Sequence, residues 1–272
     1  MHTTTLGHRA ARRPGSGYGL RTVAQMEWRK LRTVRSSWML VAVFAAGMIS
    51  LAVLALSHDS YGQMSAAERA SFDPTSDALL GLVLGQLLLG ALGVLAITTE
   101  FSSGMIRATF AVAPRRPLVL VAKAAVVGAV TLAAGQLSAF AAFFIGQAIL
   151  TAPAPHSTLG QSAVLRAVLM AGAYPALIAL IGLGLGAIIR HTAGALGALI
   201  CVVFVLPLLV SALGSSIQDA AQKFLPDTMR NSLTAVRPVP HLLSPWPTFG
   251  LLCAYAIVAL AVGAWALGRR DA

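Results

Sequence analysis

The sequence predicts an all-α membrane protein that crosses the bilayer several times. Three observations predict this class: the chain has six long apolar stretches, it is 57% hydrophobic with only 11% charged residues, and its basic residues gather on one side of these stretches. An α-helix needs roughly 20 apolar residues to cross about 30 Å of hydrocarbon. Because bare backbone in lipid must satisfy its own hydrogen bonds, we expect these stretches to be helices.

The six predicted spans define one domain. They lie at about 38–57, 79–98, 124–150, 167–189, 194–214 and 248–267, and none of these ranges contains a charged residue. We expect residues 20–272 to form a single six-span transmembrane domain. Residues 1–19 show no hydrophobic periodicity and are expected to form a disordered cytoplasmic tail.

The distribution of charge predicts the orientation in the membrane. If the N-terminus is cytoplasmic, fifteen of the 20 Lys and Arg residues lie inside and six of the nine Asp and Glu residues lie outside. This is the bias of the positive-inside rule, and it places both termini in the cytoplasm. The net charge of +11 is then explained by anionic lipid headgroups of the inner leaflet, and not by a nucleic acid partner.

An amphipathic helix is expected directly before the first span, over residues 20–36. Its apolar stripe at a helical spacing consists of Leu20, Val23, Ala24, Leu31 and Val34. Glu27 falls in the middle of this stripe, where a carboxylate is costly unless it has a partner. Two interpretations stay open, a pair with Lys30 one turn further on and a contact with a cytoplasmic subunit.

The cytoplasmic stretch between spans two and three, residues 98–123, is the most informative segment. Glu100 sits where span two leaves the membrane, and Gly104 can break or tightly turn the chain. Residues 105–112 are expected to form a short amphipathic helix that Pro114 ends. The inner surface before span three is marked by three basic residues, Arg115, Arg116 and Lys123. This short helix would suit contact with a cytoplasmic motor, and the alternative is an ordinary basic loop that follows the topology rule.

Several residues inside the spans are expected to shape helix packing. Gly182 and Gly186 form a face of small residues that lets helices approach closely. Pro175 and Pro207 are expected to kink spans four and five, either for packing or for gating. Polar side chains that either bond across helices or line a polar path are Gln86, Gln136 and Gln147.

Motifs for catalysis and for energy coupling are missing from the sequence. The chain has no P-loop, no HExxH, no GxSxG and no paired intramembrane Asp, and none of its six His residues has a second His at metal-ligand spacing. No predicted span carries a carboxylate, Lys or His that could bind a coupling ion near the midplane. We therefore expect no enzyme and no metal or cofactor in this chain, and an energy source in another polypeptide.

Two short segments resemble a known family. Residues 27–36 (EWRKLRTVRS) are similar to the helix before the first span in many actinobacterial permeases of type-2 ATP-binding cassette (ABC) exporters. Residues 99–109 (TEFSSGMIRAT) are similar to the pattern E-[YF]-x-x-G-x-[IL]-[RT] of that family, with Met105 in place of the usual Thr. The resemblance covers about residues 20–267.

The resemblance implies an ATP-driven exporter in a bacterial plasma membrane. Two permease subunits, identical or different, would pair with two cytoplasmic ATPase subunits that bind ATP and Mg. Residues 20–36 and 100–113 would dock on the ATPases, and the substrate would be hydrophobic or amphipathic but is not identified. The residues expected to couple the permease to the ATPase are Glu27, Lys30, Glu100, Gly104, Arg107 and Arg115. The alternatives are a carrier that works without an ATPase and a membrane scaffold or sensor.

Overall fold

The computed structural model describes residues 19–58, 61, 64–112, 116–152, 154–212 and 215–269. Most of the predicted N-terminal tail, Pro114 and Arg115 lie outside the described residues. The described part of the chain is helical and contains no strand, which confirms the predicted fold class. Six helical segments are long and apolar enough to cross a membrane. They are α2 (Arg35–His58), α5 (Leu82–Ser102), α7 (Arg116–Ile149), α8 (Ser162–Ile189), the segment α9–η2–α10 (Thr192–Ser211) and α13 (Pro245–Arg269).

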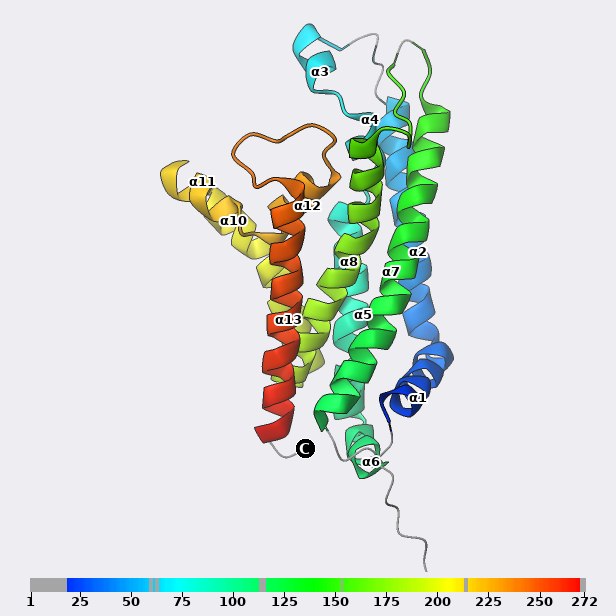
Figure 1. Cartoon of the computed structure of the whole chain (residues 1–272), viewed down its shortest axis with the longest axis vertical. Helices are drawn as coiled ribbons and strands as arrows, with labels where there is room; N and C mark the ends of the chain where they lie inside the picture. The colour runs from blue at the N-terminus through cyan, green and yellow to red at the C-terminus, as the bar shows by residue number, and fades with distance from the viewer. Residues whose placement is uncertain are drawn as a thin grey trace, which may run out of the picture.

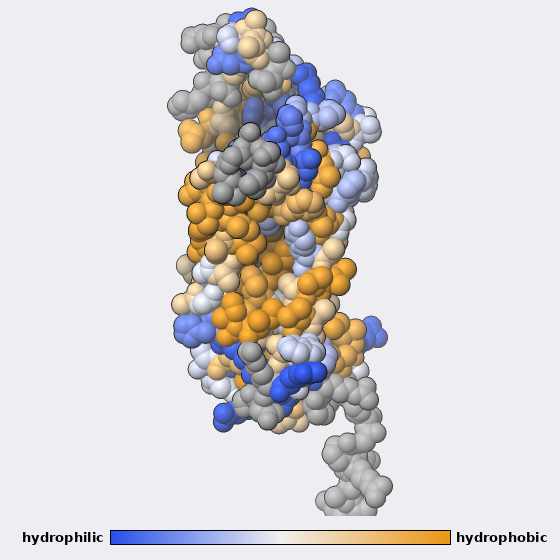
Figure 2. Space-filling model, turned by 90° about the vertical axis from the view of Figure 1, so that its left-hand side faces the viewer, coloured by the Kyte–Doolittle hydropathy of each residue, from blue (hydrophilic) through white to orange (hydrophobic). Residues whose placement is uncertain are grey.

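Six shorter helices lie at the two ends of the bundle (Figure 1). At one end are α1 (Leu20–Thr33) and α6 (Met105–Val112), together with the C-terminal end of α13. At the other end are α3 (Ala66–Ser71), α4 (Pro74–Ala78), α11 (Ser215–Gln222) and α12 (Pro226–Thr234). A broad apolar band separates the two more polar ends, as expected of a protein that crosses a bilayer (Figure 2).

Helix α8 lies at the centre of the bundle. It packs against α5, α7 and α13, and also against α9 and α12. Of the most apolar stretch of α8, 67% is buried inside the protein, compared with 22% in α2 and in the α9–η2–α10 segment. The latter two elements are therefore peripheral and expose large apolar side chains outward, among them Val43, Leu54, Leu208 and Leu209.

Helix α7 differs from the predicted span three. It begins at Arg116, eight residues before the predicted start, and its 34 residues extend roughly 50 Å. Pro117 lies in the first turn, where a missing N–H does no harm. The helix is longer than the hydrocarbon is thick, and Lys123 lies about 10 Å from its start. Lys123 is thus part of the helix and is buried, whereas we expected it to mark the surface before the span.

Span five is interrupted near Pro207. Five residues, Cys201–Val205, form a π-helical turn (η2), and the N–H of Leu206 donates to the carbonyl of Cys201. A proline cannot donate to the carbonyl four residues earlier, so a local change of helix type is an expected accommodation. Helix α10 and the following α11 point away from the neighbouring α13 (Figure 1). Pro175, by contrast, lies inside α8, which continues on both sides of it.

The three glutamines within the spans bond to other parts of the protein. Gln86 accepts a hydrogen bond from the Tyr174 hydroxyl and donates to Asp227 of α12 at 3.3 Å. The Gln136 amide donates to the Leu169 carbonyl at 2.7 Å. The Gln147 side chain accepts from the Ser157 N–H at 2.8 Å. Each glutamine therefore connects its helix to another segment of the chain.

Candidate functional site

The site begins on the buried face of α1. Val23, Glu27 and Leu31 are spaced four residues apart and form the side of α1 that packs mainly on α7. Only 3% of Glu27 is exposed, although it is a carboxylate in an apolar stripe. The two ends of the predicted stripe, Leu20 and Val34, remain exposed. The centre of the stripe therefore faces the protein, and Glu27 needs a buried partner.

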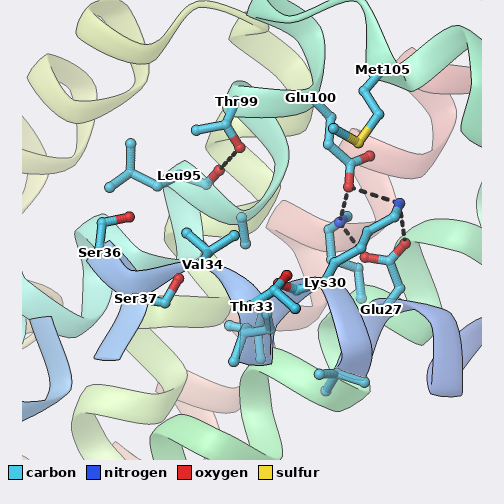
Figure 3. Close-up of a pocket in the computed structure, with 15 residues that line it drawn as sticks. Glu27, Lys30, Thr33, Val34, Ser36, Ser37, Leu95, Thr99, Glu100 and Met105 are labelled. Atoms are coloured by element: carbon cyan, nitrogen blue, oxygen red, sulfur yellow. Dashed lines mark hydrogen bonds and ion pairs between the residues drawn. The ribbon is translucent and has the colours of Figure 1, made fainter. Parts of the chain in front are cut away.

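The partners of Glu27 come from its own helix and from α7. Its Oε1 atom accepts from the Lys30 ammonium at 3.0 Å, and its Oε2 atom accepts from Lys123. Lys123 is only 4% exposed and donates a second bond, of 2.8 Å, to Oε1 of Glu100. Lys30 also donates to this Glu100 oxygen, at 3.1 Å. The four side chains thus form a closed cluster of two acids and two bases, which we call the charged cluster (Figure 3).

Helix α6 joins the charged cluster through Thr109. The Lys30 ammonium donates to the Thr109 hydroxyl oxygen at 3.1 Å, and that residue is only 5% exposed. The turn between α5 and α6 contains Gly104, whose φ of 70° lies in the left-handed region that glycine adopts without strain. This turn directs α6 back under the end of α5 (Figure 1). Four helices, α1, α5, α6 and α7, therefore meet at the charged cluster.

The charges of the cluster balance, but its hydrogen bonds do not. Burial of the Lys30 ammonium favours its neutral form, yet the carboxylates of Glu27 and Glu100 outweigh this and raise the pKa of Lys30 above its ordinary value. Lys30 uses its three protons on Glu27, Glu100 and Thr109. Both lysines share one oxygen of Glu100, and the other, Oε2, is buried without a partner among the described residues.

A cavity of about 220 Å³ adjoins the charged cluster. Its walls come from α1, from Val34 between α1 and α2, and from the first turn of α2. The other walls are the C-terminal half of α5, the start of α6, and α7. Apolar side chains line it, among them Leu95, Val126 and Val127, together with the hydroxyls of four Ser and Thr residues. The hydroxyl-bearing residues are Thr33, Ser36, Ser37 and Thr99.

The structure brings together three of the residues that the sequence singled out. Glu27, Lys30 and Glu100 belong to the charged cluster, and Gly104 lies in the adjoining turn. Arg107 lies on α6, where it is exposed and has no hydrogen bond or ion pair to the described residues. Arg115 lies outside the described residues.

The remaining sequence candidates lie elsewhere in the bundle. On α8, a side chain at Gly182 would collide with the Gly90 carbonyl of α5, and one at Gly186 would lie 2.7 Å from Ile97. Both glycines therefore allow α5 and α8 to approach closely. The two prolines described above lie in α8 and α10, which are not among the four helices that meet at the charged cluster.

Lys123 is the member of the cluster that the sequence reasoning missed. A signal was present: Lys123 lies between Val119 and Val127 at intervals of four residues, and all three are buried. Glu27 interrupts the stripe of α1 in the same way. Two apolar stripes that each contain one charge, of opposite sign, are expected to face each other because pairing lowers the cost of burial.

Comparison with known proteins identifies the family. No curated protein matches the chain. Residues 23–208, which are more than half of the chain, match the family described as ABC-2 family transporter protein. The matched region contains the whole charged cluster, the cavity beside it, four of the six span-length segments and most of the fifth. The chain therefore belongs to the ABC-2 family of membrane transport proteins.

Proposed function

We propose that this protein is the membrane permease of an ATP-driven exporter and that a separate cytoplasmic ATPase binds the ATP and Mg. Two permeases, identical or different, would assemble with two ATPases in a bacterial plasma membrane. The end that carries α1 and α6 would face the cytoplasm, as the positive-inside rule favours. The cargo would be hydrophobic or amphipathic, because the spans are apolar and contain only a few Gln and Ser residues.

The observation that carries this proposal is the charged cluster. It connects the two short helices at one end of the molecule, α1 and α6, to the C-terminal end of α5 and the N-terminal part of α7. Removing one partner of a buried ion pair typically costs about 3–5 kcal/mol, so these helices are expected to move together. A push on α6 or α1 would therefore reach α5 and α7, and through α5 the central α8.

The surface of this end offers contacts for an ATPase. Met105 is 49% exposed and Arg107 is also exposed, both on α6, while Trp28 of α1 is 41% exposed. Side chains of these types are enriched in protein interfaces. On the inward side of α6, Thr109 bonds to Lys30 of the charged cluster, so one side of α6 would receive the ATPase and the other would transmit its movement.

Substitution of Glu100 tests the coupling role. Glu100→Ala leaves both lysines with one carboxylate and detaches α5 from α1, so we expect transport to fall at least tenfold while membrane insertion and ATPase assembly persist. The measurement is ATP hydrolysis and efflux of hydrophobic dyes by complexes purified in mild detergent and reconstituted. Glu68→Ala, at an exposed carboxylate of the opposite end, is the matched control. Normal efflux by Glu100→Ala would exclude the role given to Glu100.

The burial of the charged cluster also favours a second candidate, a carrier driven by protons. Glu100 and Lys123 lie in helices of span length and are buried, and ionisable groups in such positions often bind coupling ions. Affinity purification with subunit identification by mass spectrometry separates the two candidates. A P-loop ATPase at one copy per permease supports the exporter. A permease without an ATPase that moves cargo along a proton gradient supports the carrier.

A further inference from the structure

The cavity beside the charged cluster has two chemically different parts. On α5, Leu95 lies more than one helical turn before Glu100, and on α7, Val126 and Val127 follow Lys123 by about one turn. These apolar side chains therefore lie between the charged cluster and the middle of their spans. The rim contains exposed hydroxyl residues, and a broad apolar lining with a few polar groups is typical of a binding cavity.

The polar part of the cavity holds hydrogen-bond donors that the protein does not use. Among the described residues, no protein group bonds to the side-chain hydroxyl of Ser36 or of Ser37. Both lie in the first turn of α2, where the helix dipole favours an anion, although the Ser37 N–H already donates to the Val34 carbonyl at 3.2 Å. Figure 3 shows Ser36 and Ser37 on the other side of the cavity from the charged cluster.

The charged side chains that line this cavity balance, and two arginines lie close by, outside its lining. The charged cluster itself is neutral, with two carboxylates and two ammonium groups. Arg32 and Arg35 flank the junction between α1 and α2 and are both exposed. Glu100 also lines the cavity, and its buried Oε2 atom has no partner among the described residues. A ligand that fits both parts therefore offers an acceptor group to Ser36 and Ser37 and a hydroxyl donor to Glu100, as the phosphate and the glycerol of a phosphatidylglycerol headgroup do.

We propose that this cavity binds an anionic phospholipid of the inner leaflet. The phosphate accepts hydrogen bonds from Ser36 and Ser37, the remaining polar headgroup faces the charged cluster, and an acyl chain leaves along Leu95 and Val126. A volume of about 220 Å³ suits a headgroup and not a whole lipid, since one water molecule occupies roughly 30 Å³ in the liquid. The bound lipid fills the space between α1, α5 and α7 and so keeps α1 docked.

The proposal is tested on the purified permease alone, so its outcome does not depend on the proposed exporter function. Delipidated protein in detergent is titrated with phosphatidylglycerol, and bound lipid is counted by native mass spectrometry. We expect one tightly held lipid per chain. Ser36→Ala with Ser37→Ala should weaken its binding at least tenfold. Ala96→Leu, which fills part of the cavity from α5, should weaken it independently of the serines.

The matched control is Ser57→Ala, at the other end of the same helix, where the hydroxyl donates to the Leu54 carbonyl. Equal lipid binding by the wild type, the double serine variant and Ala96→Leu would show only lipid bound around the spans and would overturn the proposal. A second experiment adds inorganic phosphate as a competitor of phosphatidylglycerol. If it displaces phosphatidylglycerol at equal concentration, the site is one for free phosphate, and the lipid assignment is wrong.

Discussion

At the scale of single residues, each charge of the cluster depends on the others. A carboxylate or ammonium group inside a protein carries a large desolvation cost, which only close pairing offsets. Glu27 and Lys123 are 3% and 4% exposed and lie on different helices, so neither could be buried in this way alone. Glu100 is the least satisfied member of the cluster, because its Oε2 atom is buried and has no hydrogen-bond partner among the described residues.

Removal of the Lys123 charge tests this interdependence. Lys123→Met keeps the length and apolar stem of the side chain but leaves Glu27 and Glu100 with Lys30 as their one base. We expect the free energy of unfolding in micelles to fall by about 3–5 kcal/mol. Lys223→Ala, outside the charged cluster, should change it by less than about 0.5 kcal/mol. Equal stability of Lys123→Met and the wild type would contradict the pairing.

The raised pKa of Lys30 predicts how α1 responds to alkaline pH. A base whose pKa is higher in the folded protein stabilises that fold at pH values below its ordinary pKa of 10.5. This contribution is lost as the pH rises through the raised value. The protection of the α1 backbone against hydrogen exchange, relative to the intrinsic exchange rate at each pH, should therefore fall above about pH 10.5. In Lys30→Met this fall in protection should be smaller, and an identical fall in both proteins would show that Lys30 is not responsible.

At the scale of helices, small residues decide which surfaces touch. Helices α5 and α8 approach so closely that a side chain at Gly182 would meet the backbone oxygen of Gly90. The same holds for α5 and α2, where a side chain at Gly81 would lie 2.5 Å from the Cα atom of Met48. In lipid, helices gain stability mainly from such close packing. The charged cluster therefore connects to the centre of the bundle through the α5–α8 contact and, from Lys123, through the contact of α7 with α8.

Alanine substitution of two glycines separates close packing from helix propensity. Gly182→Ala places a methyl group against a backbone atom that cannot move aside, and overpacking of this kind costs about 1–3 kcal/mol. Gly197→Ala, in the peripheral α9, meets nothing within 4 Å and removes only a helix-weakening glycine. Thermal unfolding should thus show a lower Tm for Gly182→Ala and an unchanged or higher Tm for Gly197→Ala. The opposite order would contradict the α5–α8 contact.

At the scale of the whole molecule, the two ends of the bundle are held by different means. One end is organised around the charged cluster. At the other end α8 holds α12: the Tyr174 hydroxyl, shared with Gln86, lies 3.0 Å from the Pro226 carbonyl, and Arg166 donates to the carbonyl of the C-cap residue Ala235 at 2.8 Å. Asp73, the N-cap of α4, accepts from the Val236 N–H at 3.0 Å. The ends are thus suited to different tasks.

Single cysteines test the orientation of the two ends. With Cys201 and Cys253 replaced by Ala, Ala67→Cys on α3 and Arg107→Cys on α6 each introduce one exposed thiol. A maleimide that does not cross membranes should label the Ala67→Cys protein in intact cells. It should label the Arg107→Cys protein only after the cells are opened. The reverse pattern would place α1 and α6 outside the cell and would rule out a cytoplasmic ATPase on them.

Some of this architecture could be predicted because it depends on the local sequence. Hydrophobic length alone indicates the six spans, and the helix over residues 105–112 follows from a glycine, a short periodic segment and a proline. Glu27 and Lys30 are one turn apart on one helix, so their pairing could be anticipated from spacing. The predicted positions of the helix ends were less accurate, since Arg116 and Pro117 are compatible with either a loop or the first turn of a helix.

The sequence by itself determined that this protein crosses the membrane, where its spans lie and which end carries the positive charge, because these properties depend on the length and composition of consecutive residues. Only the tertiary structure decided that Lys123 joins Glu27 and Glu100, that α8 occupies the centre, and that a cavity lies beside the junction of α1 and α2. The physical reason is that the partner of a buried charge, or the wall of a cavity, comes from residues far apart in the chain. Helical periodicity shows which residues share a face, but only the packed bundle shows what that face meets.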